Sequence, residues 1–312
     1  MKSKLRFATS TLAVTALLLI FTLTQPYWSS NGPTQDGQVQ ASTIDDSVQP
    51  QPAPEKPVKY VTFKVTGKQS LAELKSRFGS EGFLTILKIN RLDQDHVRTG
   101  SELLIPTEQA DLLAFSPFPE EIESVKDIPK FVLVSRKVQA FGAYESGKLV
   151  WWGPTSTGKK STKTPAGLFH TNWRSKSRIS SINPNWILPW AFNLDLVNGI
   201  AFHQYDLPGY PASHGCVRLL ESDAKWVFNW SDQWILSKPE NKQIAYGTPV
   251  IIFDEYAYGQ MPPWKRLPAD PKAASVSIDE IEKLLNNHLS VIEARSQERE
   301  VVMATIVQAS AK

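Results

Sequence analysis

Residues 213–219 have the sequence SHGCVRL and contain Cys216, the only cysteine in the 312-residue chain. A single thiol cannot form an internal disulfide, so Cys216 is either a buried, inert side chain or one retained for its reactivity. Gly215, directly before it, lets the backbone approach a ligand closely, and the consecutive N–H groups of such a turn can converge on an anion. The stretch therefore offers a thiol and candidate donors for an oxyanion, two requirements of cysteine catalysis.

A catalytic cysteine also needs a base, because a free thiol with a pKa near 8.5 is mostly protonated at pH 7. Of the four histidines before Cys216, the two nearest are His214, two positions before it, and His203, thirteen positions before it. A side chain two residues away in a tight, glycine-containing turn tends to point elsewhere, whereas a residue on a neighbouring strand can face the thiol across a sheet. We therefore predict that His203 is the base.

The sequence around these residues predicts a mainly β domain over residues 129–253. Residues 131–135 and 139–144 are rich in apolar and aromatic side chains, and Ser146-Gly147 forms a hairpin signal between strands. Residues 247–252, GTPVII, are typical of a final strand.

Several motifs in this region occur in a fixed order. They are GKLV at 147–150, STG at 156–158, TPAGLF at 164–169, His203, and SHGCVR at 213–218. Their order and spacing resemble the L,D-transpeptidase catalytic domain of the YkuD type. The resemblance implies a mixed β-sandwich or barrel-like catalytic domain with few helices.

The resemblance also implies a mechanism. The Cys216 thiolate would attack the carbonyl of the third residue of a peptidoglycan stem peptide and leave a thioester acyl-enzyme, with His203 as base. An amine of a second stem peptide would then form a 3→3 crosslink, or an envelope protein would be attached. Such acyl transfer needs no metal or organic cofactor.

The remaining motif residues have alternative roles. Ser213 and His214 either brace the turn or contact substrate or oxyanion together with Gly215, and Arg218 either holds a substrate carboxylate or pairs with a local acid. Gln204 departs from the glycine that many relatives have after the catalytic histidine. In those relatives the backbone carbonyl of that residue orients the catalytic imidazole, and any residue can supply a backbone carbonyl.

Two other functions stay open. A hydrolase would use the same chemistry with water as acceptor, acting as an L,D-carboxypeptidase or cutting protein–peptidoglycan links, and nothing in the sequence separates it from the transpeptidase. A non-catalytic peptidoglycan-binding protein is disfavoured, because Cys216, His203 and Gly215 are all present.

A second, smaller domain is predicted at residues 60–107. Val61, Phe63 and Val65 alternate like a half-buried strand, a helix capped by Ser70 and Glu73 follows, and a helix and strand complete the segment. Ile89-Asn90 and GSELLIP at 100–106 resemble the lysin motif (LysM), a βααβ module that binds glycan strands. A spacer domain that binds no ligand is the alternative. We expect a glycan-binding module to be separable, so that its deletion weakens retention on peptidoglycan and spares the chemistry.

The ends of the chain predict targeting and packing. Residues 1–24 combine Lys2, Lys4 and Arg6 with an apolar run, which indicates a cleaved signal peptide or an uncleaved anchor in the inner membrane, and hence export to the periplasm. Residues 25–59 are polar and proline-bearing, as in a linker, and 275–295 predict a C-terminal helix capped by Ser277 and Glu280. A net charge of +3 with scattered basic residues argues against a nucleic-acid partner.

Overall fold

The computed structural model describes residues 58–108 and 110–311, which fall within one compact unit of the chain, Glu55–Lys312. The predicted signal segment at 1–24 and almost all of the predicted linker at 25–59 lie outside the described residues. Within the described ranges, no helix is both long enough and apolar enough to cross a membrane.

The N-terminal part has the predicted strand and helix order. Strand β1 (Tyr60–Lys64) pairs antiparallel with β2 (Glu102–Pro106), and α1 (Lys68–Asn90) lies between them in sequence. Helix α1 consists of two helical segments that meet at Gly79, where φ is +66°, a conformation that glycine adopts at little cost.

The start of α1 differs from the prediction. The helix begins after Gly67, so Ser70 is its third residue rather than its cap, and the Ser70 hydroxyl accepts the Gly67 N–H. The predicted alternation of β1 is also incomplete, because Val61 is 51% exposed while Val65 is buried.

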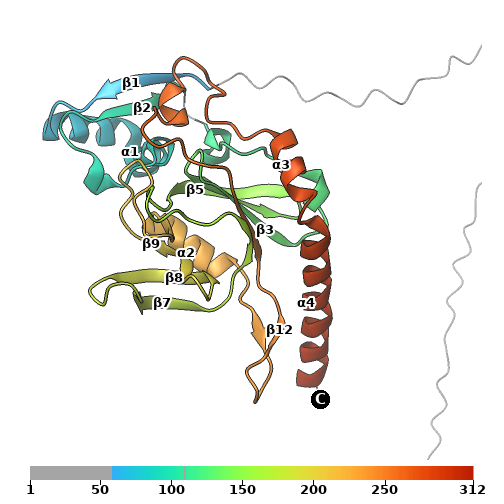
Figure 1. The fold of residues 1–312 in the computed structure, drawn as a ribbon. Helices are drawn as coiled ribbons and strands as arrows, with labels where there is room; N and C mark the ends of the chain where they lie inside the picture. Colours follow the sequence, from blue (N-terminus) through green and yellow to red (C-terminus); the bar gives the residue numbers. More distant parts are fainter. Residues whose placement is uncertain (1–57, 109, 312) are drawn as a thin grey trace, which may run out of the picture. The chain divides into compact units, whose positions relative to one another are not determined.

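The main sheet contains nine strands in the order β6-β13-β3-β4-β5-β10-β9-β8-β7. Figure 1 labels β3, β5, β7, β8 and β9 of this sheet. The pairs β13/β3 and β10/β9 are parallel and the others are antiparallel. The predicted mainly β fold is confirmed. The strands are β3 (Lys130–Ser135), β4 (Ala140–Glu145), β5 (Lys148–Ser156), β6 (Gly167–His170), β7 (Arg174–Ile179), β8 (Ile187–Asp195), β9 (Ile200–Gln204), β10 (Val217–Leu219) and β13 (Pro249–Phe253).

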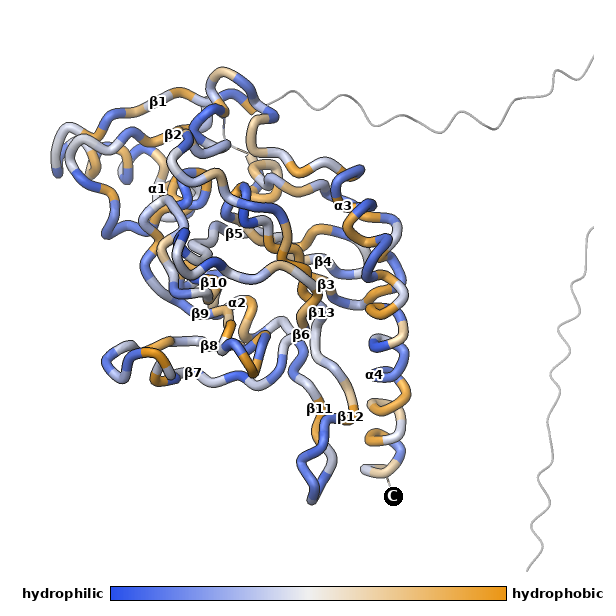
Figure 2. Tube along the Cα trace, viewed as in Figure 1, coloured by the Kyte–Doolittle hydropathy of each residue, from blue (hydrophilic) through white to orange (hydrophobic). Residues whose placement is uncertain are grey.

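Both faces of the sheet centre are buried. In β3, Phe131 and Leu133 belong to one apolar cluster, and Val132 and Val134 belong to another. Because side chains alternate along a strand, this division means that β3 is covered on both sides, which explains its unbroken apolar sequence. Figure 2 shows the same hydrophobic concentration around β3, β4 and β13.

Helices cover the two faces. Helix α2 (Glu221–Trp230) covers the second cluster through Ala224 and Val227, and α3 (Ile278–Leu285) covers the first through Ile281 and Leu285. A separate ribbon of β11 (Ile235–Leu236) and β12 (Gln243–Ala245) lies beside α4 (Leu289–Ser310) in Figure 1.

The predicted C-terminal helix at 275–295 is two helices. The capping box of Ser277 and Glu280 is present at the start of α3. The chain then leaves the helical path near His288, and α4 continues to Ser310, beyond the predicted end. The 3-4 spacing of apolar residues could not distinguish one long helix from two consecutive helices. Either arrangement buries the same apolar side chains.

The N-terminal part is joined to the main sheet by buried polar contacts. Lys88 of α1 is fully buried, and its ammonium donates to Asp223 Oδ1 at 2.7 Å and to the Trp152 carbonyl at 3.2 Å. Arg91, also buried, donates to the Val138 carbonyl at 2.9 Å. Removal of Lys88 would leave the buried Asp223 carboxylate without its cation. We therefore predict that the main sheet needs the N-terminal part for its stability, contrary to the expectation of a separable module.

Candidate active site

The pairing of β9 with β10 brings the predicted nucleophile and base to one face of the sheet. Arg218 lies opposite His203 in the parallel register, and Cys216 is two residues before Arg218. Side chains at two-residue spacing in a strand share a face, so the three side chains point the same way. All three line one small cleft, and His214 from the turn lines it as well.

The imidazole of His203 is held in a defined tautomer. His203 is almost fully buried, and its Nδ1 is 3.0 Å from the Gln204 carbonyl oxygen. Because that oxygen only accepts, Nδ1 of the neutral ring carries the proton and Nε2 keeps a lone pair. The backbone carbonyl after the histidine is therefore in place although the residue is Gln204 rather than glycine.

The surroundings favour the neutral forms of both groups. Burial lowers the pKa of His203 to about 4, with the Arg218 charge acting in the same direction and the Gln204 carbonyl opposing it. Burial raises the pKa of the Cys216 thiol, against the Ala201 N–H and the Arg218 charge. The resting pair is therefore a thiol and a neutral imidazole. The thiol itself is 3.5 Å from the Gly199 carbonyl oxygen.

Ser213 and Gly215 build the turn before Cys216. The Ser213 hydroxyl donates to the Cys216 carbonyl at 2.6 Å and accepts the Gly215 N–H at 3.1 Å. That N–H is thus engaged within the turn. Gly215 has a φ of +119°, which an L residue with a side chain rarely adopts.

The STG and TPAGLF motifs support this turn from the other side. The Thr164 hydroxyl donates to the Gly215 carbonyl at 2.7 Å and accepts the Gly158 N–H at 2.8 Å. A Cβ on Gly158 would lie 2.1 Å from the Thr162 carbonyl oxygen, so only glycine fits. Sequence reasoning identified both motifs by resemblance, and the contacts give their physical role.

His214 is placed differently from His203. Its Nε2 is 3.0 Å from the Lys159 ammonium, which can only donate, so the lone pair of that nitrogen is occupied. Its ring packs against Trp186, with centroids 4.9 Å apart. His214 therefore lines the cleft but has no free basic nitrogen facing the thiol, since its Nδ1 must then carry the proton.

Arg218 has no carboxylate partner among the described residues. Its guanidinium lies over the Tyr205 ring at 4.5 Å, and Nη1 makes a long contact of 3.4 Å to the Asp206 carbonyl. No acid side chain in the described part of the chain lies within salt-bridge distance, although, against the lowering by burial, the Asp206 charge acts to raise the pKa of Arg218, and the Arg218 side chain lines the cleft. Sequence reasoning missed Tyr205 as a cleft residue and missed the Lys159 contact with His214, because nothing in the local sequence marks either residue.

The far wall of the cleft comes from the β7–β8 hairpin. Ser180, Ile182, Trp186 and Leu188 line it. No group of three or more His, Cys, Asp or Glu side chains in the described ranges is arranged to hold a metal ion.

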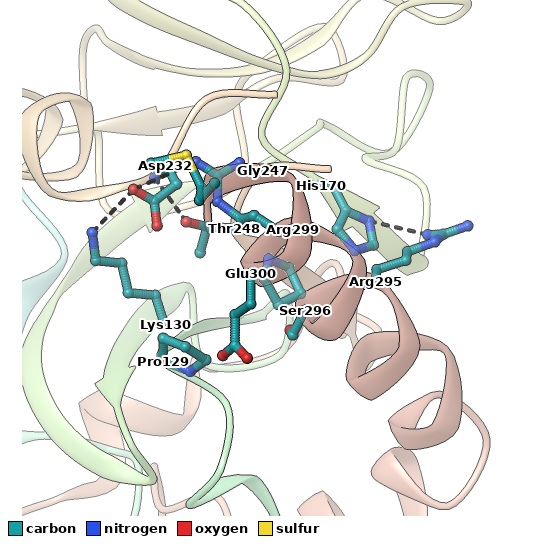
Figure 3. A pocket seen from close by; sticks show the side chains of 12 residues that line it. Pro129, Lys130, His170, Asp232, Gly247, Thr248, Arg295, Ser296, Arg299 and Glu300 are labelled. Carbon is teal, nitrogen blue, oxygen red and sulfur yellow. Dashed lines mark hydrogen bonds and ion pairs between the residues drawn. The ribbon is translucent and has the colours of Figure 1, made fainter. Parts of the chain in front are cut away.

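A second pocket lies against α4 and contains His170 (Figure 3). The Arg295 guanidinium donates to His170 Nδ1 at 3.2 Å. Burial and then the Arg295 charge lower the pKa of His170 to about 3, so this histidine is neutral. The contact of His170 Nδ1 with Arg295 joins α4 to β6 at the sheet edge, which is a structural role.

Comparisons by sequence identify one family. Residues 129–252 match the YkuD family model, described as the L,D-transpeptidase catalytic domain. The matched region is less than half of the 312-residue chain. A search of curated proteins gave no match.

Solved structures similar to the chain include three L,D-transpeptidases. One from Stackebrandtia nassauensis has 25% identity and a TM-score of 0.33, covering 41% of this chain and 57% of that protein. L,D-transpeptidase 3 from Mycobacterium tuberculosis, in complex with a faropenem-derived adduct, has 20% identity and a TM-score of 0.32, covering 40% and 60%. A mutant enzyme from Enterococcus faecium has 20% identity and a TM-score of 0.32, covering 50% and 56%.

The chain therefore spans less than two-thirds of each of these three proteins. The family match, by contrast, includes the whole cleft from the STG motif to Arg218. Residues 129–252 thus match the L,D-transpeptidase catalytic domain family, YkuD.

Proposed function

We propose that this protein is a cysteine L,D-transpeptidase that acts on peptidoglycan stem peptides, with Cys216 as nucleophile and His203 as general base. One observation carries the proposal. The chain's only thiol and an imidazole with an unoccupied Nε2 lone pair share one face of the sheet and line one cleft. Family membership of residues 129–252 supplies the substrate class.

The neutral resting pair defines the first step. His203 Nε2 takes the Cys216 proton as the sulfur attacks the carbonyl of the third stem residue, so a C–S bond and an oxyanion form together. Collapse of the tetrahedral intermediate breaks the C–N bond, and the His203 imidazolium returns the proton to the departing amine. The products are a thioester on Cys216 and free D-alanine.

The second step reverses these roles. An acceptor amine attacks the thioester, His203 removes its proton, and the sulfur leaves and is reprotonated. A stem-peptide amine gives a 3→3 crosslink, and an amine of an envelope protein gives protein attachment. The chemistry uses no metal or organic cofactor.

Arg218 is proposed to hold a substrate carboxylate. Its guanidinium faces the cleft without an acid side chain within salt-bridge distance, and partial burial lowers its pKa without removing its charge. A carboxylate of the stem peptide would supply the missing counter-charge and could bind bidentately. His214 is proposed to contact the substrate beside it.

Incubation of the purified full-length protein with disaccharide tetrapeptide muropeptides, followed by mass spectrometry, tests the function. A dimer that has lost one D-alanine supports the transpeptidase. A tripeptide monomer alone would identify a carboxypeptidase. No change, with Cys216 intact, would leave the non-catalytic alternative and a hydrolase specific for protein–peptidoglycan links.

We also propose an exported, periplasmic location with residues 1–24 as a cleaved signal or membrane anchor, and glycan binding by the lysin-like residues 60–107. Fractionation of cells and sedimentation of the protein with insoluble peptidoglycan test these two points separately.

A further inference from the structure

The N-terminal part of the chain contacts the active-site loop directly. This loop, residues 205–212, connects β9, which carries His203, to the SHGCVRL turn. Asp93, which follows α1, makes both contacts with Leu207: the Leu207 N–H donates to Asp93 Oδ2 at 2.7 Å, and the Asp93 N–H donates to the Leu207 carbonyl at 3.0 Å.

Apolar contacts reinforce this attachment. Leu207 is fully buried, Leu92 forms an isolated bridge with Pro208, and a Cβ on Gly209 would lie 3.0 Å from Leu92 Cδ2. Gly209 also has a φ of +87°, so the loop follows a path that brings it close to Leu92.

Asp93 is itself fixed on the N-terminal side. Its Oδ1 accepts the His96 N–H at 2.9 Å and is 2.7 Å from His96 Nδ1. The other oxygen, Oδ2, accepts the Leu207 N–H, so each carboxylate oxygen of Asp93 binds a different segment of the chain. A carboxylate held at both oxygens fixes the position of the loop residue that it binds.

The residues immediately before Leu207 make the contacts that orient the catalytic side chains. The Gln204 carbonyl binds His203 Nδ1, and the Tyr205 ring lies under Arg218 and edge-on to His203 at 5.8 Å. The Asp206 carbonyl contacts Arg218. A shift of Leu207 would therefore reach both His203 and Arg218 through three consecutive residues.

We propose that Asp93 is a positioning residue for the active site, which it serves by fixing Leu207 and thereby the segment that orients His203 and Arg218. The proposal rests on the proposed function and adds to it that the N-terminal part is a component of the catalytic scaffold. Asp93 touches neither the cleft side chains nor the thiol in the structure, so it acts only through the loop.

The test compares full-length Asp93→Ala, Asp93→Asn and Asp95→Ala with the wild type. Asp95 is an exposed acid in the same 3₁₀ turn, Gln94–His96, and serves as the matched control for charge. Two readouts are needed: hydrogen exchange of a peptide spanning residues 204–212, and kcat and KM for muropeptide acylation. Exchange does not depend on activity.

We expect faster exchange over 204–212 in Asp93→Ala and a fall in kcat/KM of roughly 10- to 100-fold, since a displacement of about 1 Å can cost 100-fold. KM should rise together with the fall in kcat, because Arg218 and His203 both move. Asp93→Asn, which keeps the shape and one oxygen, should recover part of the loss, and Asp95→Ala should match the wild type.

Unchanged kinetics in Asp93→Ala, with or without faster exchange, would overturn the positioning role while leaving the transpeptidase intact. Equal loss in Asp95→Ala would also overturn it. If Asp93→Ala does not fold, Asp93→Asn decides by the same criteria. If the wild type forms no acyl-enzyme, the proposed function is refuted, and hydrogen exchange alone then tests the role of Asp93. Unchanged exchange over residues 204–212 in Asp93→Ala would in that case also refute the fixing of the loop by Asp93.

Discussion

Lys88 and Asp223 form a fully buried ion pair, with Nζ and Oδ1 2.7 Å apart, between α1 and the first turn of α2. The Trp151 indole N–H donates to the same Asp223 oxygen at 3.0 Å, and Lys88 lies over the Trp151 ring. Asp223 also lies against Gly153, where a Cβ would be 2.4 Å from Oδ2. The pair therefore connects the N-terminal part with both β5 and α2.

Asp223→Ala should destabilise the protein by about 3–5 kcal/mol, because it leaves the buried Lys88 ammonium without a counter-charge. Urea unfolding measures the change. Glu221→Ala is the matched control, since Glu221 pairs with Lys225 on the same helix at 2.7 Å but both side chains are largely exposed. Its loss should be about 1 kcal/mol or less. Equal effects would contradict the importance of the buried pair.

Deletion of residues 60–106 should give an insoluble or unfolded protein rather than an active catalytic fragment. The deletion exposes Trp152 and leaves Asp223 unpaired, and it removes the Asp93 contact with Leu207. Circular dichroism and soluble yield check the outcome. A folded fragment with wild-type acylation would restore the expectation of a separable module.

Much of the fold and of the candidate site could be predicted from the sequence, for identifiable reasons. The apolar run of β3 and the Ser146-Gly147 turn are local signals. The choice of His203 over His214 followed from sequence distance, because a strand neighbour can face the thiol.

Contacts between distant residues could not be predicted in this way. Lys88 lies in a helix whose local pattern gives no sign of a fully buried cation, and its partner is 135 residues away. The Lys159 contact that occupies His214 Nε2 likewise joins residues 55 apart. Both depend on tertiary pairing that periodicity does not encode.

A carbapenem should add covalently to the wild-type protein at Cys216 and fail to add to Cys216→Ala. The strained lactam carbonyl is an acyl donor that needs only a thiol and a base to open. Intact-mass analysis followed by peptide mapping checks the result. The alanine variant should keep its unfolding midpoint within a small margin, because it removes one sulfur atom. An adduct elsewhere in the chain would contradict the assignment of the nucleophile.

The pH dependence of acylation should follow the lowered pKa of His203. The imidazole acts as base only when neutral, and its pKa of about 4 keeps it neutral throughout the range in which an ordinary histidine, with a pKa near 6.5, becomes protonated. The acid limb of kcat/KM should therefore lie near pH 4. Between pH 6.5 and pH 4 the His203 imidazole is protonated more readily in the unfolded state than in the folded state, so the free energy of unfolding falls as the pH drops. Circular dichroism must therefore confirm that the protein is folded at each pH. An acid limb near 6.5 in folded protein would contradict the buried environment.

The last prediction separates His203 from His214. Nε2 of His203 has a free lone pair because Nδ1 donates to the Gln204 carbonyl, whereas Nε2 of His214 already accepts from Lys159. His203→Ala should therefore slow acylation by about 10²- to 10⁴-fold, the usual loss on removal of a general base, and should abolish the acid limb near pH 4. His203→Gln, which fills the same space and can still bind the Gln204 carbonyl, should be equally slow, which excludes a packing defect as the cause.

His214→Ala should reduce the rate by less than about 10-fold and keep the acid limb, since only a wall of the cleft is altered. Stopped-flow acylation by a carbapenem between pH 3 and 8, over the range in which circular dichroism shows folded protein, measures both quantities in one experiment. If the limb disappears in His214→Ala and persists in His203→Gln, the base is His214, and Lys159 must release it during the reaction.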